Sequence, residues 1–221
     1  MNISKALLVA SILSTATLAT TASWADDLVT YNITITNLTP GQPIAPAMAA
    51  THSSSVSFFQ VGAAPSPELA NLAEAGDGNP MAAKLLATPG VSDAQVASAG
   101  IAPGGSITMT VTAHNVQDRL SLGAMLGNTN DAFIAISNVA LPKGRQKLIY
   151  TADAYDAGTE TNDEACVTVP GPACGGAALS PEDSGEGFVY IHNGIHGIGG
   201  LSAANYDWRN PVAQITIQRA Q

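Results

Sequence analysis

The order of apolar and polar residues predicts a chain built mainly of β-strands. Between residues 28 and 38, Tyr31, Ile33 and Ile35 alternate with asparagine and threonine. A period of two, rich in β-branched residues, is typical of a half-buried strand. Similar runs occur at residues 56–61, 106–113, 120–126, 132–136, 147–155, 188–192 and 212–218. Clusters of Pro, Gly, Asn and Asp separate them, so we predict an all-β fold, an antiparallel β-sandwich.

One segment between predicted strands has a helical pattern instead. Residues 66–74 open with Ser66, a favoured helix-capping residue, followed by a proline at the first helical position. Leucine and alanine side chains then fall on one face. Two more short helices are expected at residues 81–87 and 91–98. This short helical insertion is too small to be a domain, and the chain has no internal repeat, so we expect one domain.

The amino end has the features of an export signal. Lys5 precedes an uncharged apolar run, residues 6–19, and small residues follow up to Ala25. This pattern predicts a signal peptide at residues 1–25, leaving a mature domain of residues 26–221 that is secreted or periplasmic. An uncleaved membrane anchor is the alternative, but serine and threonine dilute the apolar run. No later segment is long and apolar enough to span a membrane.

The charge of the chain argues against polyanionic partners. The formal net charge is −9, and without Lys5 the mature chain keeps seven basic residues against 17 acidic ones, a charge of −10. An acidic surface repels nucleic acid and anionic lipid and favours cations. Solubility alone is a sufficient reason for such a charge, so it identifies no function.

The chain has two cysteines, Cys166 and Cys174, and the seven residues between them include a Pro-Gly-Pro sequence. In an oxidising compartment such a pair most simply forms one disulfide across a turn. A metal site is the alternative, but the sequence has no third cysteine and no histidine nearby. The spacing also differs from the Cys-x-x-Cys of redox-active pairs.

Known catalytic motifs are absent from the sequence. It has no Gly-x-Ser-x-Gly elbow, no phosphate-binding loop with lysine and no His-Glu-x-x-His helix. His192 and His196 have a spacing that suits zinc on a helix, but four nearby glycines argue against a helix there. We therefore expect these histidines to be structural.

Two acidic clusters suggest a different metal. One is residues 128–131, just before a predicted strand, and the other is residues 153–160, just after one. Ca²⁺ requires six to eight oxygen ligands, and Gly158 permits a tight turn that brings Asp156 and Glu160 toward the same ion. Acidic loops are also common in soluble proteins without bound metal, so composition leaves both readings open.

Several short motifs occur together in the order in which the spondin domain family has them. They include Phe-Phe-Gln-Val-Gly at residues 58–62, Leu-Ala-Glu-Ala-Gly at 72–76, Asn-Asp-Ala-Phe at 130–133 and Tyr-Asp-Ala-Gly-Thr-Glu at 155–160. The opening strand at residues 31–38 and the closing strand at residues 210–218 are also similar. The chain therefore resembles a bacterial, single-domain member of the F-spondin type of domain.

The resemblance implies a C2-like antiparallel β-sandwich that binds one calcium ion through carboxylates and has no catalytic activity. The residues that match the family's ligand motifs are Asp131, Asp156 and Glu160. The chain departs from the family at two positions: Ala132 replaces a tryptophan, and Glu160 replaces an aspartate. Because the longer Glu160 side chain changes the distance to an ion, its geometry and affinity differ from the family pattern.

Together these inferences predict a secreted or periplasmic Ca²⁺-binding module that works by binding another molecule. The expected partner is an extracellular or envelope protein, or a glycan, in adhesion at the cell surface. Two alternatives stay open: a purely structural envelope domain, and a hydrolase with His192 or His196 as general base.

Overall fold

The computed structural model describes residues 28–114, 118–180 and 185–221 of the chain. The predicted signal peptide and its cleavage site lie outside these residues. The strands are β1 (Val29–Asn37), β2 (Met48–His52), β3 (Val91–Val96), β4 (Ser106–Ala113), β5 (Arg119–Met125), β6 (Ala132–Ala140), β7 (Lys147–Asp156), β8 (Tyr190–Ile191) and β9 (Ala213–Arg219). The helices are α1 (Pro67–Glu74), α2 (Asn79–Leu86) and α3 (Ala203–Tyr206).

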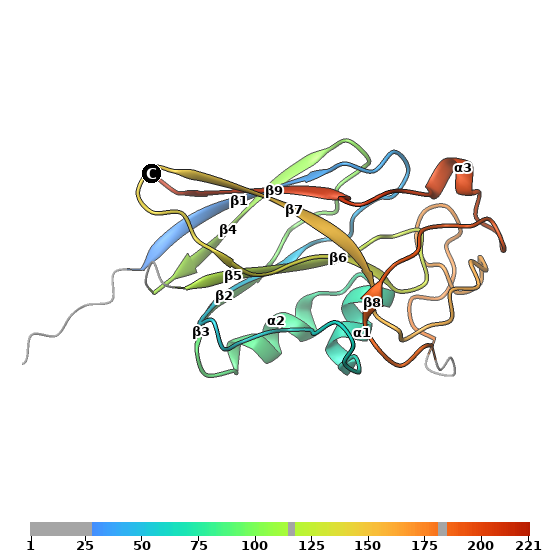
Figure 1. Ribbon diagram of the computed structural model, residues 1–221, viewed down its shortest axis with the longest axis horizontal. Helices are drawn as coiled ribbons and strands as arrows, with labels where there is room; N and C mark the ends of the chain where they lie inside the picture. The colour runs from blue at the N-terminus through green and yellow to red at the C-terminus, as the bar shows by residue number, and fades with distance from the viewer. Residues whose placement is uncertain (1–27, 115–117, 181–184) are drawn as a thin grey trace, which may run out of the picture.

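The strands form a nearly closed antiparallel sandwich, as the sequence predicts (Figure 1). Their order is β3-β2-β5-β6-β7-β9-β1-β4, with β8 paired to β7. Strand β7 belongs to both layers, because residues 147–152 pair with β9 and residues 153–156 pair with β6. It therefore passes from one layer to the other and ends beside the start of β6.

The alternation in β1 follows from the burial of only one of its faces. Tyr31, Ile33 and Ile35 are fully buried in the central core, and the residues between them are partly exposed. Strand β1 pairs with β4 on one side and with β9 on the other. Its outer face meets solvent, which is why the period of two is so clear in the sequence.

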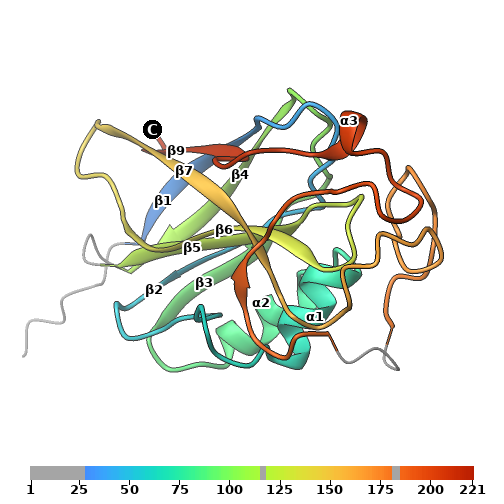
Figure 2. The same cartoon turned by 45° about the vertical axis from the view of Figure 1, so that its right-hand side comes forward.

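A second core lies between the other layer and the first two helices. Leu69 and Leu72 of α1 and Met81 of α2 pack with Phe133 of β6 in this cluster. Figure 2 shows α1 and α2 beneath β2 and β3, on the side away from β1 and β9. The side chain of Ser66 accepts a hydrogen bond from the Leu69 N–H (3.3 Å), so the predicted cap is confirmed.

Three details of the predicted secondary structure are wrong. The helix expected at residues 91–98 is an edge strand, β3, because pairing with β2 outweighs the helix propensity of its alanine and glutamine. Residues 56–61 form no strand; they fold over the second core and bury Phe58 against Gly123. The strand expected at 188–192 is limited to β8.

One side chain links the two edge strands of the sandwich. Strands β3 and β4 are the two ends of the strand order. Asp93 of β3 accepts hydrogen bonds from the N–H of Thr112 in β4 (2.7 Å) and from its hydroxyl (3.1 Å). No helix among the described residues is long and apolar enough to cross a membrane.

Candidate metal site

The candidate site lies where β6 begins and β7 ends. Asp131 directly precedes β6, and Asp156 is the last residue of β7. The register pairs Ala132 with Asp156, and the Ala157 N–H donates to the Asp131 carbonyl oxygen (3.2 Å). Antiparallel pairing thus brings two residues that are 25 positions apart to the same end of the sandwich.

Asp131 is fully buried, and the turn after β7 holds one of its two carboxylate oxygens. Its Oδ2 accepts hydrogen bonds from the Thr159 N–H (2.7 Å), the Thr159 hydroxyl (3.1 Å) and the Glu160 N–H (3.1 Å). Its Oδ1 accepts no hydrogen bond from the described residues. A carboxylate oxygen in that position is costly unless a proton or a cation compensates it.

Asp156 is also fully buried, but both of its oxygens have donors. Its Oδ1 accepts from the Gly158 N–H (2.7 Å), and its Oδ2 accepts from Asn162 Nδ2 (2.5 Å). The Tyr190 hydroxyl also bonds to this carboxylate. The turn depends on Gly158, which has a φ of +70°. A Cβ atom added at this position would lie 2.3 Å from the Phe188 carbonyl oxygen, so no other residue fits.

The electrostatics of the pair favour a bound cation or proton. Burial, followed by repulsion from Asp156, raises the pKa of Asp131 to about 8. Burial raises the pKa of Asp156 to about 6, and its hydrogen bonds to Asn162 and Gly158 oppose the rise. Two carboxyl groups this close cannot both ionise freely without a compensating positive charge.

Glu160 is the third predicted ligand, and the structure places it in the same turn. Its side chain is buried, and its main-chain N–H donates to Asp131. Within residues 28–114, 118–180 and 185–221, no three His, Cys, Asp or Glu side chains form a ready metal cluster. The structure thus brings Asp131 and Asp156 together, and the three-carboxylate set stays a prediction.

The residues do fit a calcium ion that is only partly enclosed by side chains. Each carboxylate oxygen carries two lone pairs, so an oxygen that accepts one hydrogen bond can still bind a metal. Ca²⁺ takes backbone carbonyl oxygens, amide oxygens and water as readily as carboxylates. Asp131 Oδ1 accepts no hydrogen bond from the described residues, so both of its lone pairs are available to an ion.

His192 is held in a structural role next to this site. Its Nδ1 accepts a hydrogen bond from the Gly194 N–H (2.9 Å), which leaves the proton on Nε2, 3.1 Å from Asn162 Oδ1. Burial lowers the pKa of His192 to about 4, and its ring packs against Trp208. The lone pair that a general base needs is therefore already engaged.

The second histidine and a buried glutamate organise the neighbouring loop. Glu164 accepts hydrogen bonds from three successive N–H groups, those of His196 (2.5 Å), Gly197 (2.7 Å) and Ile198 (3.0 Å). His196 thus contributes its backbone to this contact. The Glu164 carboxylate therefore joins the segment that follows β7 to the segment that follows β8.

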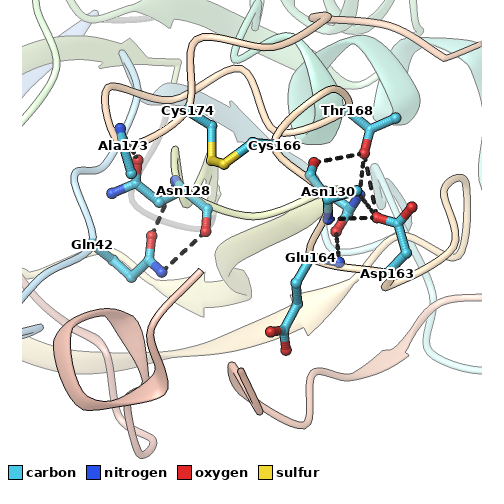
Figure 3. The surroundings of a disulfide bond; sticks show 10 residues. Gln42, Asn128, Asn130, Asp163, Glu164, Cys166, Thr168, Ala173 and Cys174 are labelled. Carbon is cyan, nitrogen blue, oxygen red and sulfur yellow. Dashed lines mark hydrogen bonds between the residues drawn. A yellow bond between two sulfur atoms is a disulfide. The ribbon is translucent and has the colours of Figure 1, made fainter. Parts of the chain in front are cut away.

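The disulfide between Cys166 and Cys174 is present, as the sequence predicts. Figure 3 shows that Asn128 and Asn130 lie on either side of it. Asn128 Oδ1 accepts from the Ala173 N–H (2.9 Å), and Asn130 Nδ2 donates to Asp163 Oδ1 (3.2 Å). The predicted oxygen cluster at residues 128–131 therefore contributes one buried carboxylate, from Asp131, while the two asparagines anchor the disulfide loop.

Three functional contributors were missed by the sequence reasoning. Asn162 and Tyr190 bond to the Asp156 carboxylate, and Glu164 ties the loops together. Asn162 comes two residues after Glu160, so its closeness in sequence to the predicted ligands could have marked it as a neighbour of the site. Tyr190 comes from a distant strand, and nothing in its local sequence marks it.

Comparison with protein families gives a match that covers most of the chain. A family model described as Spondin_N matches residues 24–168, well over half of the 221 residues. The matched part contains Asp131, Asp156 and Glu160 and ends between the two cysteines. No curated protein matches the chain.

Proposed function

Because the chain belongs to the spondin domain family, we propose that it is a Ca²⁺-dependent binding module of the cell envelope. The family is an extracellular, non-enzymatic kind of domain. The observation that carries the proposal is the buried pair of Asp131 and Asp156, with Asp131 Oδ1 accepting no hydrogen bond from the described residues. The protein is exported and binds an extracellular or envelope protein, or a glycan, in adhesion.

In this proposal Asp131 and Asp156 hold the ion, and Glu160 adds a third carboxylate. The ion supplies positive charge that offsets the repulsion between the two aspartates. It also ties the start of β6 to the turn after β7, the region from which the long loops of residues 157–202 extend. Calcium therefore orders the loop end of the sandwich, and that end is where the partner binds.

The test is calcium-dependent stability of the mature protein. Wild type is unfolded thermally in chelator, in Mg²⁺ and in Ca²⁺, and bound metal is measured by calorimetry and elemental analysis. A ligand at a hundredfold excess over its dissociation constant stabilises the fold by about 2.7 kcal/mol. Mg²⁺ should give less, because it requires a tighter octahedral site.

Two matched variants locate the ion. Asp156→Asn removes one charge at the site and should abolish most of the calcium response. Asp153→Asn removes one charge from the same strand, at a position that is only partly buried, and should leave the response intact. Equal calcium responses in the two variants, or no bound calcium in the wild type, would refute the site.

A further inference from the structure

The basic residues of this acidic protein are gathered at the end of the sandwich opposite the candidate calcium site. Five of the seven basic residues in the described part of the chain lie where β5 and β7 begin and where β6 and β9 end: Arg119, Lys143, Arg145, Lys147 and Arg219. Figure 1 shows this end at the left, beside the carboxyl terminus. Strand β7 alone carries Lys147 at one end and Asp156 at the other.

These five residues are not used for internal ion pairs. Lys84 pairs with Glu68, and Arg209 pairs with Asp207, but in the part of the chain that the structure describes no ion pair involves any of these five side chains. Among the described residues, the acidic groups near the basic end are Asp118, the terminal carboxylate of Gln221, and Asp93, which accepts hydrogen bonds from Thr112. Asp118 already accepts hydrogen bonds from Ser92 (2.5 Å) and from the His114 N–H (3.1 Å).

Three of the basic side chains line a depression. Its volume is about 530 Å³, and its walls come from residues 144, 145 and 147 and residues 218–221. Arg145, Lys147 and Arg219 are exposed there, so their charged groups are available to a ligand. Arg and Lys side chains converging on one hollow suit the oxyanion groups of a carboxylate or a sulfate ester.

The depression adjoins a sheet face of β1, β4 and β9 whose outward side chains are uncharged. On the outer side of β1, β4 and β9, the residues paired across the sheet have hydroxyl or amide side chains: Asn32, Thr34, Thr36, Ser106, Thr108, Thr110, Gln214, Thr216 and Gln218. Lys147 pairs with Gln218 and joins this face to the depression. Helices α1 and α2 cover the other layer and leave this face open.

The net charge of the protein does not cancel this local field. Strand β7 has ten residues, and at about 3.3 Å per residue it separates the two ends by about 30 Å. Charges in solution are screened over about 8 Å at physiological salt. The carboxylates of the candidate calcium site are therefore several screening lengths away from a ligand at the basic end.

We propose that the basic depression and the adjoining neutral face form a second binding surface, for an acidic polysaccharide. Its carboxylate or sulfate groups pair with Arg145, Lys147 and Arg219, and its sugar hydroxyls meet the hydroxyl and amide face. An acidic peptide would leave that polar face without partners, and an anionic membrane would contact a surface with few apolar side chains. This surface is independent of the calcium site, so chelator does not affect its binding.

The test measures binding of the mature protein to dextran sulfate, polygalacturonate and neutral dextran by interferometry in chelator. We expect both acidic polymers to bind at least tenfold more tightly than neutral dextran, with affinity falling as salt increases. The double variant Arg145→Gln with Arg219→Gln should lose at least tenfold in affinity. The control double variant Lys84→Gln with Arg209→Gln removes the same charge elsewhere and should stay within twofold of wild type.

Additional variants and ligands distinguish a loss of binding from a loss of folding. Lys143→Gln with Lys147→Gln repeats the test in case the first double variant does not fold, and thermal unfolding checks every variant. Thr108→Glu puts a negative charge on the neutral face and should also weaken polymer binding. Equal losses in the test and control variants would overturn the proposal. Tighter binding to polyglutamate or to phosphatidylglycerol vesicles would also overturn it, in favour of an acidic peptide or a membrane.

Discussion

Removing calcium should make the stability of the protein fall as the pH rises from 6.5 to 8. In the folded protein, burial and the neighbouring Asp156 raise the pKa of Asp131 to about 8, whereas an aspartate in an unfolded chain has a pKa of about 3.9. Over this window the folded state therefore binds a proton that the unfolded state has released. Stability due to that proton is present at lower pH and is lost as the pH rises through the folded pKa.

The size of the effect follows from the same pKa. One fully retained proton changes the free energy of unfolding by about 1.4 kcal/mol per pH unit. Because the proton is half lost at pH 8, the fall from pH 6.5 to 8 is on the order of 1–2 kcal/mol, which is a few degrees in the unfolding temperature. His192 works weakly in the opposite direction, because burial keeps it neutral in the folded protein, with a pKa of about 4, whereas in the unfolded chain it is about half protonated at pH 6.5. This offsets roughly a few tenths of a kcal/mol of the fall.

The assay is thermal and denaturant unfolding in chelator, at intervals of half a pH unit, on wild type and on Asp131→Asn. The variant has no proton to release, so its stability should change little over the window. Saturating calcium should remove the slope in wild type, because the ion takes the place of the proton. Parallel slopes for wild type and variant in chelator would show that Asp131 does not carry the effect.

Three other outcomes follow from the sequence and the fold. Replacing both Cys166 and Cys174 by alanine should reduce the free energy of unfolding by about 2–3 kcal/mol, measured in denaturant, because the bond restricts the unfolded chain. Gly158→Ala should destabilise the protein by more than about 1 kcal/mol and weaken calcium binding in calorimetry, since its positive φ and the nearby Phe188 carbonyl leave no room for a methyl group. Mass spectrometry of the exported protein should find cleavage after Ala25, and an intact leader on membrane-bound protein would contradict this.

The alternating strand β1 was predictable from the sequence and the fully buried strand β2 was not, although β5 and β6, which are also buried on both faces, were predicted from their apolar runs. Strand β1 faces the core with one side only, so its burial alternates as its sequence does. All five residues of β2 are buried, because Ala49 packs into the central core and Met48 into the core under the helices. A strand covered on both faces needs no polar alternation, and β2 has only five residues, so neither a period of two nor a long apolar run marks it.

The candidate site was predictable in its centre and not in its surroundings. Asp131 and Asp156 stand at the ends of neighbouring strands, where both the strand pattern and the family motif place them. Their partners Asn162 and Tyr190 come from the loops and short strand of residues 157–202. Those loops are shaped by the disulfide, by Glu164 and by contacts between distant residues, and no local pattern encodes such contacts.

The long antiparallel strands explain how one small domain can keep two opposite kinds of chemistry apart. Lys147 and Asp156 belong to the same strand, yet the length of β7 exceeds the screening distance several times. A carboxylate pair at one end therefore keeps its attraction for a cation, and the arginine and lysine side chains at the other keep theirs for an anion. If the domain links a calcium-dependent partner to an acidic polysaccharide, the two ligands should bind without competing, and chelator should release only the first.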